Sequence, residues 1–187
     1  AHIQEQEAEW QNRKAERSGY EQYVPVYTVA DAVESLKLFV GYGYNKPIEI
    51  VDGITINFCD AGHLLGSSSI HITVKENDEE RTILFSGDLG NIDRPLIRNP
   101  QNPPYADYVV IESTYGDRIH GERPDYIAQL TKIMQETFSK GGNLVIPSFA
   151  IGRTQELLYL FRIIKEQGLI KGHENFLVYV DSPLAVE

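Results

Sequence analysis

The sequence has 187 residues, a formal net charge of −10 and a hydrophobic content of 42%. This composition is ordinary for a globular chain with one core or two small ones. The acidic balance counts against a protein that grips nucleic acid over a broad basic face, but not against an enzyme whose bound metal ions meet a phosphate at one point. No apolar run is long enough to cross a membrane, and the single Cys59 excludes an internal disulfide.

The first part of the chain is predicted to form two helices followed by strands. Helix formers predict a first helix over residues 3–17, and Thr28 is the predicted N-cap of a second helix that extends to Phe39. From Pro47 onward the apolar residues follow a strand-like period. Strands are predicted at 48–51, 54–60, 67–76, 81–88 and 105–114, the first four arranged as two hairpins.

After Thr114 the pattern alternates between helix and strand. Helices are predicted at 124–140 and 154–167, and buried strands at 143–147 and 175–181. This alternation predicts a parallel α/β sheet. The change of pattern places a domain boundary near Tyr115, between residues 1–115 and residues 116–187.

Three polar residues follow predicted strands, where catalytic groups tend to sit. His63 in DAGHLLGS and Asp88 in FSGDLG both lie in glycine-containing turns, and Glu112 in VVIESTYGD ends a buried strand. Each alone has a plain reading as a turn or strand-end residue. Together, His63 and Asp88 are an N/O ligand pair that zinc accepts, although a catalytic zinc usually needs three protein ligands. Glu112 is predicted to orient a histidine that acts on the metal or as a general acid.

Five ordered motifs carry a resemblance that covers essentially the whole chain. DAGHLLGSSSI, LFSGDLG, VVIESTYGD, VIPSFAIGRTQELL and VYVDSPLA resemble the metallo-β-lactamase-fold RNA-processing hydrolases with a β-CASP domain. This family includes RNase J and the cleavage and polyadenylation endonuclease. The resemblance implies an α/β fold: part of a metallo-β-lactamase αββα sandwich over residues 1–115, then the first part of a parallel β-CASP domain over 116–187.

The resemblance also implies site roles. His63 matches a ligand of one of two zinc ions, Asp88 matches the aspartate that bridges both, and Glu112 matches an acidic residue paired with a histidine that protonates the leaving group. It implies RNA as the partner, with single-stranded DNA and a homodimer left open, no membrane partner, and a cytoplasmic location. The HxHxDH motif of the family is absent, so we interpret the chain as an internal piece of a longer protein. Alone, it is predicted to be inactive and to bind zinc weakly or not at all, which isothermal titration would test.

A second group of candidates lies after the domain boundary. Ser148 and Arg153 flank the predicted start of a helix, where free backbone N–H groups and the helix dipole favour phosphate. Ser182 follows the last predicted strand and is a further candidate for phosphate binding. The alternatives are an ordinary strand–helix loop with Thr154 as the cap and Arg153 paired to a nearby acid, and a turn before a proline.

The leading hypothesis is therefore zinc-dependent hydrolysis of RNA phosphodiesters by the parent protein. One alternative is a non-catalytic scaffold subunit of the same fold, which loss of HxHxDH upstream would favour. Another is a metallo-hydrolase of thioesters or lactones. Assays on single-stranded RNA and on a thioester, with and without chelator, distinguish these hypotheses.

Overall fold

The computed structural model describes residues 1–16, 22–119, 121 and 124–186. The chain divides into two compact units, Ala1–Gly43 and Tyr44–Glu187, which are described separately. Within the described residues, no helix is long and apolar enough to cross a membrane. This division differs in position from the boundary near Tyr115, which stays a prediction.

The first unit holds two short helices joined by side-chain contacts. They are α1 (His2–Glu16), α2 (Val29–Ser35) and a following 3-10 turn, η1 (Leu36–Leu38). The predicted cap at Thr28 is confirmed: its side chain accepts from the Asp31 N–H, and the Asp31 carboxylate accepts the Thr28 N–H at 2.8 Å. Glu5 Oε1 also accepts the Val29 N–H at 2.8 Å, which joins α1 to the start of α2.

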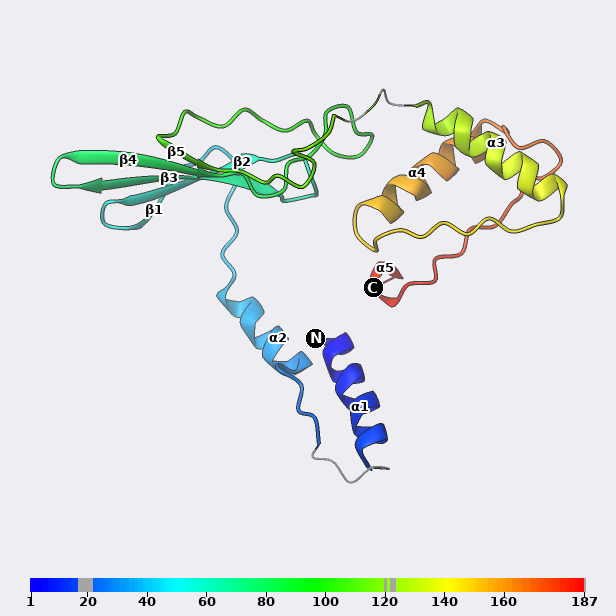
Figure 1. Cartoon of the computed structure of the whole chain (residues 1–187), viewed down its shortest axis with the longest axis horizontal. Coiled ribbons are helices and arrows are strands. Elements are labelled where there is room, and N and C mark those ends of the chain that lie inside the picture. The colour runs from blue at the N-terminus through cyan, green and yellow to red at the C-terminus, as the bar shows by residue number, and fades with distance from the viewer. Residues whose placement is uncertain (17–21, 120, 122–123, 187) are drawn as a thin grey trace. The chain divides into compact units, whose positions relative to one another are not determined.

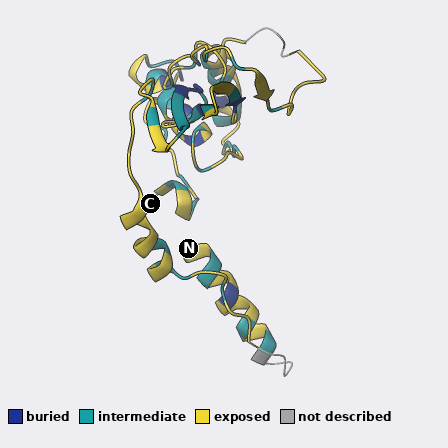
Figure 2. Ribbon diagram, turned by 90° about the vertical axis from the view of Figure 1, so that its left-hand side faces the viewer, coloured by how far each residue is buried: buried dark blue, intermediate teal, exposed yellow. Residues whose placement is uncertain are grey.

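Two details of the first unit correct the predictions. The second helix ends at Ser35 and does not reach Phe39, whose backbone is extended. Its predicted apolar face is also not buried, since Leu36 is 63% and Phe39 76% exposed. Most of this unit is coloured as exposed or intermediate in Figure 2. The predicted last residue of the first helix, Arg17, lies outside the described residues.

The second unit begins with a five-stranded sheet, and all five predicted strands are formed (Figure 1). The fifth, predicted as a buried strand over 105–114, covers only Tyr108–Val110, and its burial was wrongly predicted because all three residues are more than half exposed. The strands follow chain order across the sheet: β1 (Ile48–Val51), β2 (Ile54–Asp60), β3 (Ser68–Glu76), β4 (Glu79–Phe85) and β5 (Tyr108–Val110). Neighbours from β1 to β4 are antiparallel, and β5 runs parallel to β4. Since β2 and β4 are both antiparallel to β3, the strands β2, β4 and β5 end at the same edge of the sheet.

The rest of the second unit is helical. It contains α3 (Tyr126–Ser139), α4 (Arg153–Glu166) and α5 (Pro183–Val186). Met134 of α3, Ile164 of α4 and the following Ile170 are at most 1% exposed and form a small apolar core. Partly buried residues around them include Phe138 and Phe161. The two predicted helices are therefore confirmed, and they bury their apolar faces against each other.

The strands predicted at 143–147 and 175–181 are wrong in this structure. Both segments are drawn as irregular loops beside the helices in Figure 1, and no strand is assigned within residues 124–186. Leu144 and Phe176 pack on the helical core, whereas Val145 is 85% and Leu177 71% exposed. A buried parallel strand needs a hydrogen-bonded neighbour and cover on both faces, and these segments have cover on one side only. The fold is a mixed α/β arrangement whose only described sheet is β1–β5.

Candidate functional site

The structure brings the loops of His63, Asp88 and Glu112 to one edge of the sheet. His63 lies in the loop after β2, Asp88 follows β4, and Glu112 follows β5. These are the three strands that end at this edge. Short polar loops at the ends of rigid strands are where binding and catalytic groups are commonly held. The sheet topology thus explains why three residues that are far apart in sequence can act together.

A network of hydrogen bonds fixes the loop that carries His63. The Ser67 Oγ accepts the backbone N–H groups of His63 at 3.0 Å and Leu64 at 3.1 Å. Asp60, at the end of β2, is buried and accepts the Gly62 N–H at 2.9 Å. The His63 side chain is half-buried. These bonds satisfy the backbone of the turn, so His63 is presented from a defined loop and not from a loose one.

The loop of Asp88 lies directly on the loop of His63. The Gly90 N–H donates to the Ala61 carbonyl at 2.8 Å. A Cβ atom on Gly90 would overlap the backbone of Gly62, and one on Gly62 would overlap Pro100. Gly62 also has a φ of +63°, which L side chains rarely adopt. The two glycines are therefore required for the close backbone approach, beyond the formation of each turn.

Glu112 binds the loop of Asp88 through its carboxylate. Its Oε1 accepts the Leu89 N–H at 2.7 Å, and its own N–H donates to Ser86 Oγ at 3.0 Å. The Leu89 hydrogen bond is the main cause that lowers the pKa of Glu112, followed by a hydrogen bond from Thr114 and the charge of His63. Glu112 is thus an ionised carboxylate at neutral pH. Its carboxylate accepts a hydrogen bond from Leu89, the residue after Asp88. The charge of His63 also favours the ionised form of Glu112.

The described residues do not make a complete metal centre. Within the part of the chain that the structure describes, no group of three or more histidine, cysteine, aspartate or glutamate side chains could hold a metal ion. His63 and Asp88 are ligand types that zinc accepts, but two ligands do not hold a catalytic zinc. Asp88 is exposed at this edge. The described residues alone therefore do not supply a complete set of zinc ligands.

The phosphate-binding candidates lie in the helical part of the second unit. Ser148 and Ser182 both line a cleft of about 1160 Å³ between α4 and the two irregular segments. Ser148 Oγ is hydrogen-bonded to Thr154 Oγ1 at 2.9 Å. Arg153 does not line this cleft, and its guanidinium is paired with Glu156 at 2.9 Å. The structure thus groups the two serines and separates Arg153 from them.

The start of α4 differs from the predicted one, which had Thr154 as the helix cap. Its N-cap is Gly152, with a φ of +86°, and Arg153 is the first helical residue. The Gly152 N–H donates to Gln155 Oε1 at 2.6 Å. Thr154, which the plain reading took as the cap, lies inside the helix and donates its hydroxyl to the Phe149 carbonyl. The same alternative interpretation paired Arg153 with a nearby acidic residue, and the structure confirms this pair as Arg153–Glu156.

The sequence did not predict an ion pair between two further charged residues. Arg94, in the loop after Asp88, forms an ion pair with Glu156 of α4 at 2.6 Å. Glu156 is 6% exposed, which is unusual for a carboxylate. An acidic residue in the first turn of a helix is normally expected to be exposed to solvent and to interact favourably with the helix dipole. Its burial depends on Arg94, which is 62 positions away in the chain and carries no local signal.

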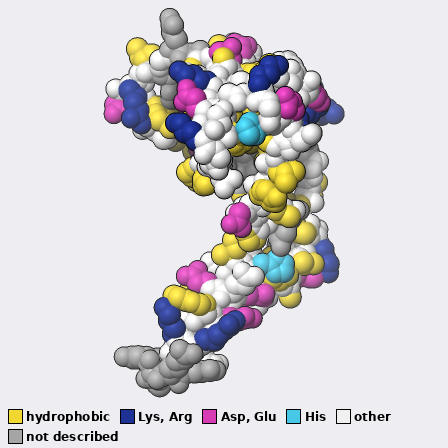
Figure 3. Space-filling model, turned by 90° about the vertical axis from the view of Figure 1, so that its right-hand side faces the viewer, with side chains coloured by type: hydrophobic (Ala, Val, Ile, Leu, Met, Phe, Trp, Pro, Cys, Tyr) yellow, Lys and Arg dark blue, Asp and Glu magenta, His cyan; other side chains and the backbone are white. Residues whose placement is uncertain are grey.

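The visible surface shows no broad basic face. In Figure 3, lysine and arginine side chains are interspersed with aspartate and glutamate on the face seen there. This distribution agrees with the net charge of −10.

Comparison with known proteins identifies the family. No family model matches the chain. It is 34% identical over 168 residues to ribonuclease TTHA0252 of Thermus thermophilus, which covers 86% of this chain and 35% of that protein. It is 31% identical to an RNase J-like protein of Methanocaldococcus jannaschii (84% and 37% covered) and 33% identical to cleavage and polyadenylation specificity factor 73 of Drosophila melanogaster (72% and 19%).

The chain belongs to the metallo-β-lactamase/β-CASP family of RNA-processing nucleases. The family resemblance drawn from the five motifs is thereby confirmed. The chain spans about a third of the length of the first two relatives, and less of the Drosophila protein.

Proposed function

We propose that this chain is part of a ribonuclease that hydrolyses RNA phosphodiester bonds at a zinc site to which His63 and Asp88 contribute ligands. The observation that carries this is the joining of three loops at one sheet edge, with Gly90 on Gly62 and Glu112 on Leu89. The names of the relatives, ribonuclease and RNase J-like protein, support the class of substrate and reaction. In this proposal the remaining zinc ligands come from parts of the protein outside these residues.

The proposed roles follow from the geometry. Two bound zinc ions would supply an activated water and stabilise the charge that develops on the phosphate. His63 comes from a loop fixed by Ser67, and Asp88 from a loop fixed by Gly90, so both approach the site with little conformational freedom. Glu112 holds a negative charge beside His63 and is proposed as the catalytic acidic residue that orients a protonating histidine.

RNA phosphates are proposed to reach the cleft lined by Ser148 and Ser182. The Ser182 hydroxyl can donate to a phosphate oxygen, and the Ser148 hydroxyl can do so when it releases its hydrogen bond to Thr154. Arg153 is 58% exposed and can add a charged contact beyond its bond to Glu156. The finer fold assignment is proposed with it: a metallo-β-lactamase part over residues 1–115 and the start of a β-CASP part over 116–187. A cytoplasmic location and a homodimer belong to the same proposal.

The test uses the full-length protein that contains this chain. Single-stranded RNA cleavage and bound zinc are measured for the wild type, His63→Ala and Asp88→Asn, with His2→Ala and Asp52→Asn as controls at exposed positions. We expect loss of cleavage by at least about 100-fold and loss of zinc in the two site variants, as for removal of a metal ligand, with the controls unchanged.

Three results would contradict the proposal. RNA cleavage that persists in chelator would rule out the zinc mechanism. Turnover of a thioester in place of RNA would identify a small-molecule hydrolase. An intact, zinc-free protein that binds RNA without cleaving it would identify a scaffold subunit.

A further inference from the structure

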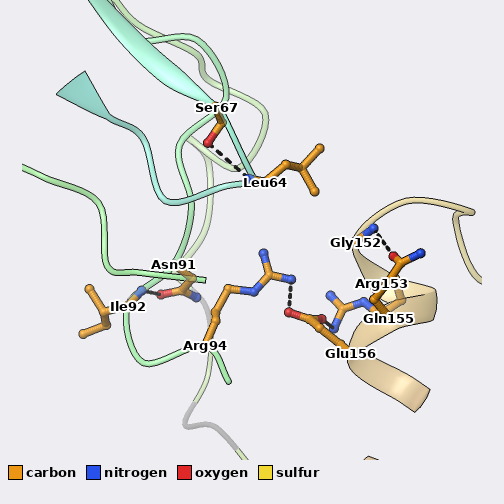
Figure 4. A network of polar contacts seen from close by, with 9 residues as sticks. All are labelled: Leu64, Ser67, Asn91, Ile92, Arg94, Gly152, Arg153, Gln155 and Glu156. Atoms are coloured by element: carbon orange, nitrogen blue, oxygen red, sulfur yellow. Dashed lines mark hydrogen bonds and ion pairs between the residues drawn. The ribbon is translucent and has the colours of Figure 1, made fainter. Parts of the chain in front are cut away.

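The carboxylate of Glu156 binds two arginines from different parts of the chain. Its Oε1 lies 2.6 Å from Arg94 Nη2, and its Oε2 lies 2.9 Å from Arg153 Nη1. Figure 4 shows the Arg94 side chain reaching from its loop to the first turn of α4, where Arg153 approaches the other side of the carboxylate. Each oxygen therefore has its own charged donor.

The Arg94–Glu156 pair is largely buried, whereas the ion pairs that do not include Glu156 are exposed. The side chain of Glu156 is 8% exposed and that of Arg94 20%. On the same helix, Arg162 and Glu166 form a pair whose side chains are 61% and 64% exposed. Exposed pairs are weakened by solvent and salt, whereas removal of one partner of a buried pair leaves an uncompensated charge. The Arg94–Glu156 contact is therefore the ion pair with the largest structural consequence among those compared.

A second contact joins the same two parts of the chain. Leu64, next to His63, lies against Gly152 at the start of α4, and a Cβ atom on Gly152 would lie 2.7 Å from Leu64 Cδ2. Leu64 is shown close to this helix start in Figure 4. The loop of His63 thus contacts α4 through an apolar side chain, and the loop that follows Asp88 contacts α4 through Arg94.

We propose that Glu156 is a positioning residue that holds the His63 and Asp88 loops in their active geometry through Arg94. The proposal rests on the proposed ribonuclease function of these loops. Arg94 lies six positions after Asp88, and the intervening Gly90 is bonded to the Ala61 carbonyl. Release of Arg94 frees the far end of this loop, and displacement of reacting groups by about 1 Å can lower a rate by about 100-fold.

The catalytic test compares Glu156→Gln and Arg94→Gln with Glu166→Gln in the full-length protein on single-stranded RNA. Glu156→Gln keeps the side-chain shape and removes the charge. We expect kcat to fall by roughly 10- to 100-fold in the first two variants. KM should change by less than about 3-fold in Arg94→Gln, because this variant moves the loops and leaves the Arg153–Glu156 pair in place. Glu166→Gln removes the exposed pair on the same helix and leaves both constants unchanged.

The double variant provides a stricter criterion. Arg94→Gln combined with Glu156→Gln should be no slower than the worse single variant, because both remove one interaction. Multiplied effects would overturn the proposal, as would a normal kcat in well-folded Glu156→Gln protein. Thermal unfolding is measured in parallel. A variant that melts earlier but retains its kcat at a temperature where it is folded shows a structural role only, which also overturns the proposal.

Hydrogen exchange separates this proposal from the proposed function. The N–H groups of Leu89 and Gly90 are bonded to Glu112 and Ala61. We expect both to exchange at least about 10-fold faster in Glu156→Gln and Arg94→Gln than in wild type, with no change in β3 amides. Unchanged exchange would overturn the positioning role. Faster exchange in a protein whose wild type does not cleave RNA would leave the loop contact established and refute the ribonuclease function.

Discussion

Apolar segments predicted strands both in the sheet region, residues 44–112, and in the helical region, residues 124–186. The strands form in the sheet region and do not form in the helical region. In the sheet region every strand finds its partner within about 25 residues, and the expected hairpins form. In the helical region the helices form, but the two apolar segments between them remain irregular and partly exposed. An apolar run predicts that a segment will be buried. Whether it becomes a strand depends on a neighbour that the run itself does not specify.

The largest effect is expected where the sheet region depends on close backbone contact. Gly90→Ala would place a methyl group on the backbone of Gly62, which cannot move without disturbing Pro100. We expect a loss of about 3 kcal/mol or more in the free energy of unfolding, above the usual range for overpacking because the obstacle is main chain. Urea unfolding measures the loss, and hydrogen exchange should show it in residues 61–90.

Gly66→Ala is the control in the neighbouring loop, which carries His63. Gly66 has a φ of +84° but no atom within 4 Å of the added Cβ. Only backbone strain remains, at about 1–2 kcal/mol. Equal losses in the two variants would show that the glycines serve only their turns, and the contact between the two loops would lose its importance for the sheet region.

The helical region is tested through its own small core. Ile164 is fully buried and packs with Met134 and Ile170. Ile164→Ala should lower the free energy of unfolding by about 2–5 kcal/mol, the usual cost of removing a buried aliphatic side chain. Leu158, 41% exposed on the same helix, is the control, and Leu158→Ala should cost roughly 1 kcal/mol.

The distribution of the effect sharpens the comparison. If the two regions hold separate cores, Ile164→Ala accelerates hydrogen exchange in α3 and α4 and leaves β2–β4 protected. Uniform acceleration across both regions would mean that they unfold as one cooperative unit. In that case the difference in strand formation would not reflect a difference in stability.

The sequence carried enough information for the sheet and for the loops of His63, Asp88 and Glu112 to be expected at strand ends. Alternating apolar residues and turn residues are local signals, and sheet order then places the three loops at one edge. Their direct contact was not predictable, because the fit of Gly90 on Gly62 is a property of two backbones brought together by folding. The glycines predicted a turn in the loop of His63 and a turn in the loop of Asp88. They could not predict that the two turns are in contact.

The helical region shows the limit more clearly. The sequence predicted the helix that becomes α4, but it did not predict that Glu156 on this helix is buried beside Arg94 from another part of the chain. A charged residue in a first turn looks like a solvent-facing one until its partner is known. The strand predictions for 143–147 and 175–181 were wrong for a related reason. Burial and strand pairing both need a partner that is distant in sequence.

The smallest expected effect concerns the junction of β4 with β5, the one parallel pair in the described sheet. Asp107 Oδ2 accepts the Thr82 N–H at 2.7 Å and the Thr82 hydroxyl at 2.9 Å. These bonds, the backbone one first, lower the pKa of Asp107 below its ordinary value of 3.8. A carboxyl with a lowered folded-state pKa contributes its stability above pH 3.8 and loses it as the pH falls through the folded-state value.

Asp107→Asn should therefore be less stable than wild type at pH 7, and the difference should shrink below pH 3.8 as the wild-type carboxyl is protonated. Urea midpoints measured from pH 7 to pH 2 check this, and each protein is its own control for general acid unfolding. A constant difference across that range would mean that the amide differs from the carboxylate for steric reasons. A difference that vanishes at low pH would show that the β4–β5 junction, where the sheet region turns parallel, is held in part by the ionised carboxylate.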